Sequence, residues 1–512
     1  MKATKAWLWQ STWILSVSAL ITKILSALYR VPLQNIVGDR GFFVYQQVYP
    51  LYGICNAIAL TGVPLFISQI IAENTERQRS NFKQLAILVV ILGVISSVSL
   101  YEMAPTIARL MGDDKLIPLI RSLTMFYLLA PIEALLRGSF QGTLKMLPTA
   151  LSQVVEQIVR VVIIVVAAFS FKYGILSIYN MGAWAHAGSV FGCFAALAVL
   201  GLFLPHLCLQ QVSRIRTSLG VLLRRFLNEG LLLSLFGSLL ILFQMIDSFT
   251  LLKSLRKVTA HAELIKGVYD RGQPLAQLGI VVAVSFATTL LPQISDHKNK
   301  SQLVIINKTL HIAASLATAC AVGLAVLMPQ INTLLFKDKA QSLALAVYVL
   351  AVAFISYATI MNTIMQAQHL QKRNWLVLII ALFVKWLGNL MFIPVLSISG
   401  ASWATLLAST VLAVGIYWNS GPVLQKALTE HNFLLKLLVI CGLMGLVVGM
   451  FSLISLLVFP LTRFISGVEV LVGVVLGVLV VLFYSYHWHL YTTSEWRLMP
   501  GYQLIHKKLG GK

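Results

Sequence analysis

Charged residues are scarce in this sequence. Only 11% of its 512 residues are Asp, Glu, Lys or Arg, while 58% are hydrophobic. Soluble domains carry roughly 25% charged residues, so this chain has too few to cover a water-facing surface. The shortage excludes an ordinary soluble protein.

Cysteines are few, and catalytic signatures are absent. The chain has no GxxxxGKS/T phosphate loop, no HExxH pair and no nucleophile elbow. We therefore expect no enzymatic activity, no cofactor and no metal site. No small-residue cleavage site follows the apolar run after "MKATKAWLWQ", so we expect the first helix to be retained. Five cysteines are scattered singly, without disulfide or metal spacing: Cys55, Cys193, Cys208, Cys320 and Cys441.

Acidic residues are outnumbered by basic ones, with 17 Asp and Glu against 39 Lys and Arg and a net charge of +22. In a soluble protein this balance would indicate nucleic-acid binding. In a membrane protein, basic loops set the orientation and face an anionic leaflet. We therefore expect membrane lipids as neighbours and no nucleic-acid partner.

Long apolar runs, such as Leu85–Leu100 and Val468–Tyr484, are abundant. They lie inside windows of about 20 residues, the length of a membrane helix. Lipid offers the backbone no hydrogen-bond partner, so spans must be helices or closed barrels, and the runs lack the alternation of strands. We predict an all-α polytopic membrane protein with about 14 transmembrane helices, near residues 10–34, 43–72, 84–109, 119–143, 149–171, 181–205, 227–250, 269–294, 303–328, 342–367, 375–396, 400–420, 437–460 and 467–489.

Basic residues concentrate in alternate connecting segments, among them "ENTERQRSNFK" and "DHKNKSQ". Positive residues favour the cytoplasmic side of a membrane. We therefore expect a multi-pass protein of the cell membrane with both termini in the cytoplasm.

One short phrase occurs twice. "VYQQVYPLYG" begins at Val44 and "VYDRGQPLAQ" at Val268, an offset of 224 residues. A second match pairs Arg160 with Lys385 at an offset of 225. The copies are six spans apart and therefore share one orientation. This pattern predicts two pseudo-symmetric six-helix lobes, as in some transporters, plus two extra helices.

The predicted organisation has four parts. Residues 1–205 form the N-terminal six-helix lobe and residues 227–420 the C-terminal lobe. Residues 421–512 hold helices 13 and 14 and a basic cytoplasmic tail. The linker, 206–226, has apolar residues and arginines typical of a helix in the cytoplasmic membrane interface, either coupling the lobes or serving as a plain surface helix: Arg214, Arg216, Arg224 and Arg225.

Ionisable residues inside predicted spans are the candidate functional residues, because each costs about 2.5–3.5 kcal/mol near the bilayer centre. The acids are Glu133, Glu156, Asp247 and Asp270. Cations outnumber them, and a cavity that these cations shared would hold a multiply anionic group such as a diphosphate. The cations are Lys23, Arg30, Arg137, Arg160, Arg271 and Lys385.

Two pairs, Glu133–Arg137 and Glu156–Arg160, have the i, i+4 spacing and order that favour an ion pair on a helix. We expect a four-residue network between spans 4 and 5, which either locks the lobe or serves transport. Lys385 has no acid four residues before it, so we expect it to lack a built-in counter-ion.

Arg271 follows Asp270 where span 8 begins. We expect Arg271 to contact the substrate, with a role as an interface anchor as the alternative. Asp247 in span 7 is a counter-ion, a cation-coupling site or an outer-edge residue; its position alone does not rank these roles.

Three phrases, "VYQQVYPLYGICNAIALTGVPLFISQIIAEN", "YDRGQPLAQLGIVVAVSFATTLLPQIS" and "FVKWLGNLMFIPVLSISGASWATLL", carry a family resemblance. They resemble the polysaccharide-transporter branch of the multidrug/oligosaccharidyl-lipid/polysaccharide exporter superfamily. Within it, the chain looks most like MurJ-type lipid II flippases and spore-cortex relatives of Gram-positive bacteria. The resemblance covers nearly the whole chain.

The resemblance implies translocation of an undecaprenyl-diphosphate-linked sugar from the inner to the outer leaflet, and we expect a cell-wall precursor, lipid II, as the substrate. Rocking of two similar lobes would expose the cavity to each side in turn, which is alternating access. Cavity arginines of the family correspond to Lys23, Arg30 and Arg271. Lys385 and Asn389 occupy the region where some relatives bind sodium, and a lysine there implies a built-in positive charge. A coupling ion or the membrane potential would drive export, and the lipid tail would lie along spans 13 and 14.

Three alternatives compete with the hypothesis of a lipid II flippase. A flippase for capsular or other polysaccharide repeat units would share the fold and the cavity chemistry. A multidrug/cation antiporter would line its cavity with acids, whereas this chain is rich in cations. A non-transporting scaffold would leave Arg271 and Lys385 unexplained.

Overall fold

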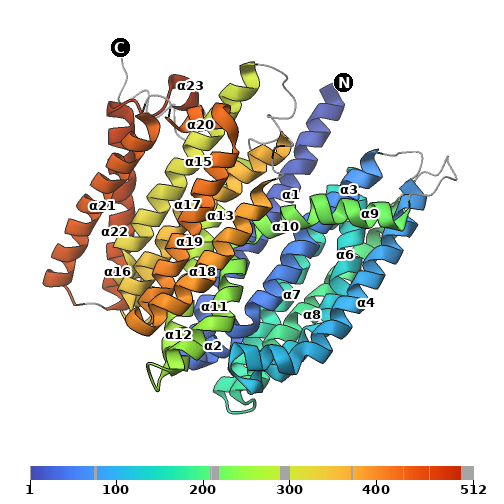
Figure 1. The fold of residues 1–512 in the computed structure, drawn as a ribbon, viewed down its shortest axis with the longest axis horizontal. Coiled ribbons are helices and arrows are strands. Elements are labelled where there is room, and N and C mark those ends of the chain that lie inside the picture. Colours follow the sequence, from blue (N-terminus) through green and yellow to red (C-terminus); the bar gives the residue numbers. More distant parts are fainter. Residues whose placement is uncertain are drawn as a thin grey trace. The chain divides into compact units, whose positions relative to one another are not determined.

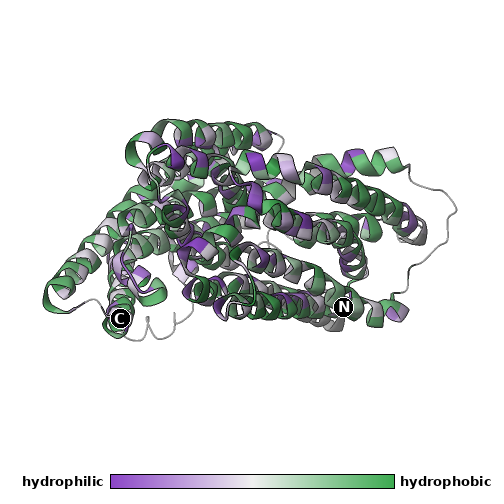
Figure 2. Cartoon of the chain, turned by 90° about the horizontal axis from the view of Figure 1, so that it is seen from below, coloured by the Kyte–Doolittle hydropathy of each residue, from purple (hydrophilic) through white to green (hydrophobic). Residues whose placement is uncertain are grey.

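The computed structural model describes residues 2–73, 78–207, 209, 218–288, 300–368, 370, 373–429, 432–460 and 462–496. Every regular element in these ranges is a helix (Figure 1). Hydrophobic residues cover most of the length of the helices (Figure 2). The predicted all-α membrane fold is confirmed.

Eleven helical segments in the described part of the chain are long and apolar enough to cross a membrane. The first, Val17–Glu73, joins predicted spans 1 and 2, and the other ten each correspond to one predicted span. Predicted span 7 is built from the shorter helices α10 (Leu231–Gly237) and α11 (Leu239–Arg256), and predicted span 8, whose end lies outside the described residues, has a break near its start. With the joined and broken spans counted separately, the segments agree with the expected number of about 14.

Contacts divide the chain into two compact units, residues 1–274 with 385–401, and residues 275–384 with 402–512. These units are defined by contacts, whereas the two predicted lobes, 1–205 and 227–420, are defined by the sequence repeat. The lobes therefore stay a prediction. The first unit contains α1 (Lys2–Leu28), α2 (Arg30–Ala57), α3 (Val63–Glu73), α4 (Gln78–Met111), α5 (Ile117–Ser122), α6 (Thr124–Gly142), α7 (Met146–Lys172), α8 (Ile178–Phe203), α9 (Leu219–Arg225), α10 (Leu231–Gly237), α11 (Leu239–Arg256) and α12 (Ala262–Asp270).

The second unit contains the C-terminal helices, and three of its helices extend into the first unit. Residues 272–274 of α13, the end of α18, from Lys385, and the start of α19, to Ala401, belong to the first unit. The helices are α13 (Gly272–Thr288), α15 (Lys300–Val326), α16 (Met328–Phe336), α17 (Ser342–Ala367), α18 (Asn374–Leu396), α19 (Ile398–Asn419), α20 (Gly421–Thr429), α21 (Phe433–Val458), α22 (Arg463–His487) and α23 (Thr493–Trp496).

Helix breaks in the first unit fall at defined residues. Gly38 interrupts α2 with φ 70° and ψ 178°, a conformation that essentially only glycine adopts. Predicted span 7 has a π-helical turn at Phe226–Gly230 and a second break at Ser238, between α10 and α11. Predicted span 8 breaks at Arg271, between α12 and α13. Two of these breaks adjoin the charged residues of the site.

The predicted linker contains helix α9, which runs across the direction of α4 and α6 (Figure 1). Arg225 at its end forms an ion pair with Glu73 of α3, with Nη2 2.6 Å from Oε1. Arg214 and Arg216 lie outside the described residues. The interfacial location of the linker therefore stays a prediction.

A buried histidine joins the C-terminal helices of the second unit. The ring nitrogens of His311 on α15 lie 2.7 Å from Glu495 Oε1 of α23 and 2.7 Å from the Ala427 carbonyl oxygen of α20. Its ring stacks on Phe433 of α21 at 3.9 Å. Burial raises the pKa of Glu495, but hydrogen bonds from His311 and from the Thr492 backbone outweigh burial and hold that pKa below its ordinary value. This contact docks α23 onto the unit.

Close packing of α6 on α3 gives a test of the fold. A Cβ at Gly138 would lie 2.7 Å from Ile67 Cβ and 2.7 Å from the Pro64 carbonyl oxygen. Because overpacking costs about 1–3 kcal/mol, we expect Gly138→Ala to lower the thermal-unfolding midpoint of the purified full-length protein in detergent. Gly323→Ala, where a Cβ meets no atom within 4 Å, is the matched control; equal midpoints for the two variants would contradict this packing.

Candidate functional site

The Gly38 break presents Asp39 to Arg271. Arg271 donates from Nε to Asp39 Oδ1 at 2.9 Å and from Nη2 to Oδ2 at 2.7 Å. This two-pronged geometry is the strongest form of the arginine–carboxylate pair. Arg271 is 1% exposed, whereas the Asp39 side chain is 20% exposed. The pair ties α2 to the break between α12 and α13.

Asp39 was missed by the sequence reasoning, which placed it in a loop. A signal was available, because Asp-Arg-Gly occurs at 39–41 and again at 270–272. Arg271 of the second Asp-Arg-Gly binds Asp39 of the first. Arg40 of the first copy forms an ion pair with Glu263 at 2.9 Å, and Arg256 also reaches Glu263, at 3.2 Å. These pairs form a charged rim beside the Asp39–Arg271 contact.

Asp270 binds a different cation from its neighbour in sequence. Lys266, one turn earlier on α12, places Nζ 2.9 Å and 3.2 Å from the two Asp270 oxygens. Gln273 donates to Asp270 Oδ1 at 2.8 Å, and Gln46 of α2 donates to Gln273 Oε1 at 2.8 Å. Since Gln46 and Gln273 belong to the two copies of the repeated phrase, those copies contact each other in the first unit.

Lys385 has a counter-ion, so the expectation that it lacks one was wrong. Its Nζ lies 2.6 Å from Asp247 Oδ1 and donates to Asn389 Oδ1 at 3.0 Å and to the Ala401 carbonyl at 3.1 Å. Asn389 and Tyr269 also donate to Asp247, at 2.8 Å and 3.0 Å. The local spacing rule missed this pair because Asp247 lies on another helix, α11. Of the roles left open for Asp247, the structure gives that of counter-ion.

The two Glu–Arg pairs predicted on spans 4 and 5 are rearranged. Glu133–Arg137 is present, with Oε1 2.6 Å from Nη2. Glu156 does not pair with Arg160 but with the same Arg137 Nη2, at 2.9 Å. The prediction for Glu156 was wrong because a helix-local rule ignores the arginine that the neighbouring helix α6 supplies.

Arg160 instead lies among tyrosines. It donates from Nη1 to the Tyr52 hydroxyl at 2.8 Å and from Nη2 to the Tyr29 and Tyr45 hydroxyls, both at 3.1 Å. Its Cζ is 3.9 Å from the centroid of the Tyr52 ring. Its charge is therefore solvated by hydroxyls and rings, which are weaker partners than a carboxylate.

Arg30 is fully buried, and its three guanidinium nitrogens make no well-formed hydrogen bond and no ion pair to a carboxylate among the described residues, although the Tyr29 hydroxyl lies close enough to interact with it. Its Cζ lies 4.1 Å from the ring centroid of Tyr49 and 6.0 Å from that of Tyr29. Arg160 is 5.4 Å and 6.0 Å from the Tyr29 and Tyr49 rings, so the two arginines share one aromatic cluster. Arg30 consequently has donors available for a ligand.

Lys23 differs from the other predicted cations. It lies on α1 and its side chain is exposed, with no ion pair or hydrogen bond to another described residue. Of the six predicted cavity cations, Arg30 and Arg160 adjoin one another. Arg271, Lys385 and Arg137 are each neutralised by a carboxylate.

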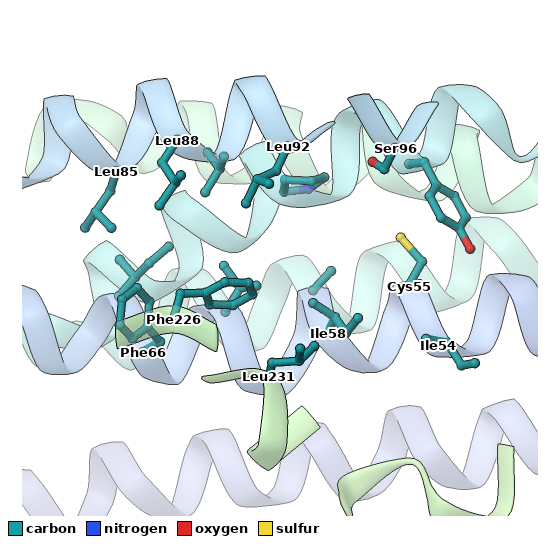
Figure 3. Close-up of a pocket in the computed structure, with 16 residues that line it drawn as sticks. Ile54, Cys55, Ile58, Phe66, Leu85, Leu88, Leu92, Ser96, Phe226 and Leu231 are labelled. Atoms are coloured by element: carbon teal, nitrogen blue, oxygen red, sulfur yellow. The ribbon is translucent and has the colours of Figure 1, made fainter. Parts of the chain in front are cut away.

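A separate cavity of about 260 Å³ lies in the first unit (Figure 3). Leu85, Leu88 and Leu92 of α4 point into it from one side, and Phe66 and Phe226 face it from the other. None of its lining residues is charged. It therefore suits an apolar chain and is not the polar site.

These features define a polytopic helical membrane protein whose first unit holds a buried cluster of paired and unpaired charges. Residues 8–298 match the family described as "Polysaccharide biosynthesis protein", and the chain belongs to that family. The resemblance to polysaccharide transporters is thereby confirmed.

Relatives in sequence agree with this membership, and a solved structure shares the fold. The chain is 34% identical over 509 residues to the uncharacterized membrane protein YabM of Bacillus subtilis (strain 168), covering 96% of this chain and 95% of that one. It is 25% identical over 492 residues to the lipid II flippase MurJ of the same organism, covering 86% and 87%. A solved lipid II flippase MurJ in an inward closed conformation shares the fold, with a TM-score of 0.67, 15% identity and coverage of 92% of this chain and 97% of that one.

The buried Lys385–Asp247 pair can be tested by stability. Removing one partner of a buried pair costs about 3–5 kcal/mol, because it leaves the other charge uncompensated. We expect Lys385→Met to lower the thermal-unfolding midpoint strongly, and addition of Asp247→Asn to recover part of the loss. The exposed Lys253 on α11 provides the control Lys253→Met. A Lys385→Met protein as stable as this control would contradict the pairing.

Proposed function

We propose that this protein is a flippase that carries an undecaprenyl-diphosphate-linked cell-wall precursor, lipid II, from the inner to the outer leaflet. It would act as a transporter rather than an enzyme. The similarity to the lipid II flippase MurJ over 86% of this chain supports the substrate class. The buried cations of the first unit supply the chemistry that a diphosphate needs.

The observation that carries the proposal is Arg30. A fully buried guanidinium without a well-formed hydrogen bond is costly, and the fold contains no carboxylate bonded to it among the described residues. A phosphate oxygen would supply the missing acceptors. Arg160, in the same tyrosine cluster, adds a second positive charge to the region.

Arg271 would hold the second phosphate and also act as part of a gate. In the present state it binds Asp39, so a phosphate must displace a carboxylate to reach it. Exchange of one anion for another keeps the charge of Arg271 compensated throughout, but it gains less free energy than phosphate binding to a bare guanidinium would. Opening of the α2 contact with α12 and α13 would then accompany substrate binding.

The properties of the membrane suggest where the lipid tail would lie and what would drive export. The isoprenoid tail gains about 0.8 kcal/mol per buried CH₂, so it would stay in lipid, along α21 and α22. The membrane potential supplies about 2.3 kcal/mol per charge per 100 mV for export of a negative head. Two similar lobes with cytoplasmic termini would alternate access to each side. Lys385 would serve as a tethered cation that keeps Asp247 neutralised without a bound ion.

Rival functions differ in their electrostatics. A cationic drug would need unpaired acids, yet Asp39, Asp247 and Asp270 each bind a lysine or arginine. A flippase for other polysaccharide repeat units would share the diphosphate site. Complementation with lipid II as the measured substrate distinguishes a lipid II flippase from a flippase for other polysaccharide repeat units.

Arg30 gives the sharpest test. We expect the intact gene to restore lipid II exposure at the surface of cells depleted of their other lipid II flippases, and Arg30→Met to abolish this restoration. Because Arg30 makes no ion pair among the described residues, the free energy of unfolding of the variant should lie within about 1 kcal/mol of the wild-type value.

The control for this test is Arg109→Ala, at an exposed position of α4. It should retain full restoration of lipid II exposure. Normal exposure with Arg30→Met at normal protein levels would overturn the site assignment. Failure of the intact gene itself would reject lipid II as the substrate.

Asp39 tests the gate. Since Asp39 competes with phosphate for Arg271, we expect Asp39→Asn to raise the affinity of the purified protein for undecaprenyl diphosphate about tenfold, or about 1.4 kcal/mol. Surface exposure of lipid II should fall at the same time, because the closing contact is weakened. The exposed Asp114 gives the control Asp114→Asn. An unchanged affinity in Asp39→Asn would argue against competition at Arg271.

A further inference from the structure

One arginine and two glutamates form a closed cluster between α6 and α7. Arg137 Nη2 lies 2.6 Å from Glu133 Oε1 and 2.9 Å from Glu156 Oε2, and Arg137 Nε donates to the Ser152 hydroxyl at 2.9 Å. Cys193 of α8 donates its thiol to Glu133 Oε2 at 3.1 Å. Arg137 is 0% exposed, Glu133 2% and Glu156 4%. The cluster is therefore removed from solvent.

The charges in this cluster do not balance. With both carboxyls ionised, Arg137 neutralises only one of them and the cluster carries a net charge of −1. An isolated buried charge is strongly disfavoured, and a carboxyl in that position takes up a proton instead. One bound proton makes the cluster neutral. Because the two carboxyls share Arg137, that proton belongs to the pair rather than to either residue.

Among the described residues, Arg137 is the cation that contacts these two carboxyls, and no second cation is bonded to either of them. From α2, Tyr52 and Cys55 lie close enough to interact electrostatically with Glu156 and Glu133 respectively. From α8 comes Cys193, a thiol. Arg160 is the nearest further cation along α7, but its hydrogen bonds go to tyrosine hydroxyls. Arg137 Nη1 is buried and has no acceptor in the part of the chain that the structure describes, so the cluster has an unused donor there.

We infer that Glu133 and Glu156 hold one exchangeable proton against Arg137, and that this cluster is the proton-binding site of the transport cycle. The coupling part of this inference rests on the proposed flippase function. In this proposal the structure corresponds to the state with the proton bound, in which the cluster is neutral and Arg160 is hydrogen-bonded to Tyr29, Tyr45 and Tyr52. Release of the proton leaves the cluster with one negative charge to be compensated.

Arg160 connects the proton site to the substrate site. It stands four residues after Glu156, in the order that favours an ion pair on a helix. Once the cluster has lost its proton, its net negative charge competes for Arg160 and draws the guanidinium away from Tyr29, Tyr45 and Tyr52. Tyr29 also lies beside Arg30, so the proton state of the cluster alters the electrostatics and packing around that arginine.

The proton site is tested on the purified full-length protein in lipid vesicles, without substrate. Infrared spectra at neutral pH should contain the carbonyl band of a protonated carboxylic acid. We expect this band to weaken in Glu133→Gln and in Glu156→Gln, and to stay unchanged in Glu102→Gln, which alters an exposed glutamate of α4. Absence of the band from the wild-type protein, or a band that neither cluster variant weakens, overturns the site. If a variant fails to fold, the wild-type spectrum still tests the proposal, because absence of the band from the wild type contradicts a protonated carboxyl.

Coupling is tested in the same vesicles with lipid II, the membrane potential being held at zero with potassium and valinomycin. We expect an inward proton gradient to accelerate lipid II export by wild type severalfold, and Glu156→Gln to lose this dependence while Glu102→Gln keeps it. Export that ignores the gradient overturns coupling. A confirmed infrared band with no lipid II movement under any gradient rejects the proposed substrate and the coupling but leaves the proton site in place.

Discussion

An ionised side chain inside a bilayer needs a partner, and this constraint organises the first unit. Asp39 binds Arg271, Asp247 binds Lys385, and Asp270 binds Lys266. Each of the first two pairs joins helices that are far apart in sequence. A charge therefore does more here than neutralise its partner, since it selects which helices lie together. Arg30 stands apart from these pairs, because it is buried without a well-formed hydrogen bond or a carboxylate partner among the described residues.

The backbone breaks serve the same constraint. A continuous helix has no unsatisfied backbone groups inside the membrane, and irregular backbone is tolerated only where protein or a polar cavity surrounds it. Gly38 breaks α2 immediately before Asp39, and α12 ends immediately before Arg271. The two breaks thus meet at one ion pair. Broken spans elsewhere in membrane transporters mark sites that bind polar ligands, which agrees with the position of the charged cluster here.

The sequence predicted what depends on short-range physics. Hydropathy located the helices, because burial of apolar side chains in lipid does not depend on which helices are neighbours. Local spacing predicted Glu133–Arg137 correctly and Glu156–Arg160 wrongly, since the second prediction required knowledge that α6 lies beside α7. The Lys385–Asp247 pair had no local signal at all. Asp39 had one, the duplicated Asp-Arg-Gly, but its meaning depends on α2 contacting α12.

The chemistry around Arg30 and Arg160 bears on how a diphosphate would be chosen from a membrane full of phospholipids. A phospholipid presents a single phosphate, which one well-placed arginine can satisfy. A carboxylate on that arginine, as Asp39 is on Arg271, lets a single phosphate gain little by replacing it. Tyrosine hydroxyls and rings stabilise the other cations without cancelling their charge. In the proposed function, a diphosphate would displace Asp39 from Arg271 with one phosphate and bind Arg30 with the other, so one paired and one unpaired arginine together would favour it over a monophosphate headgroup.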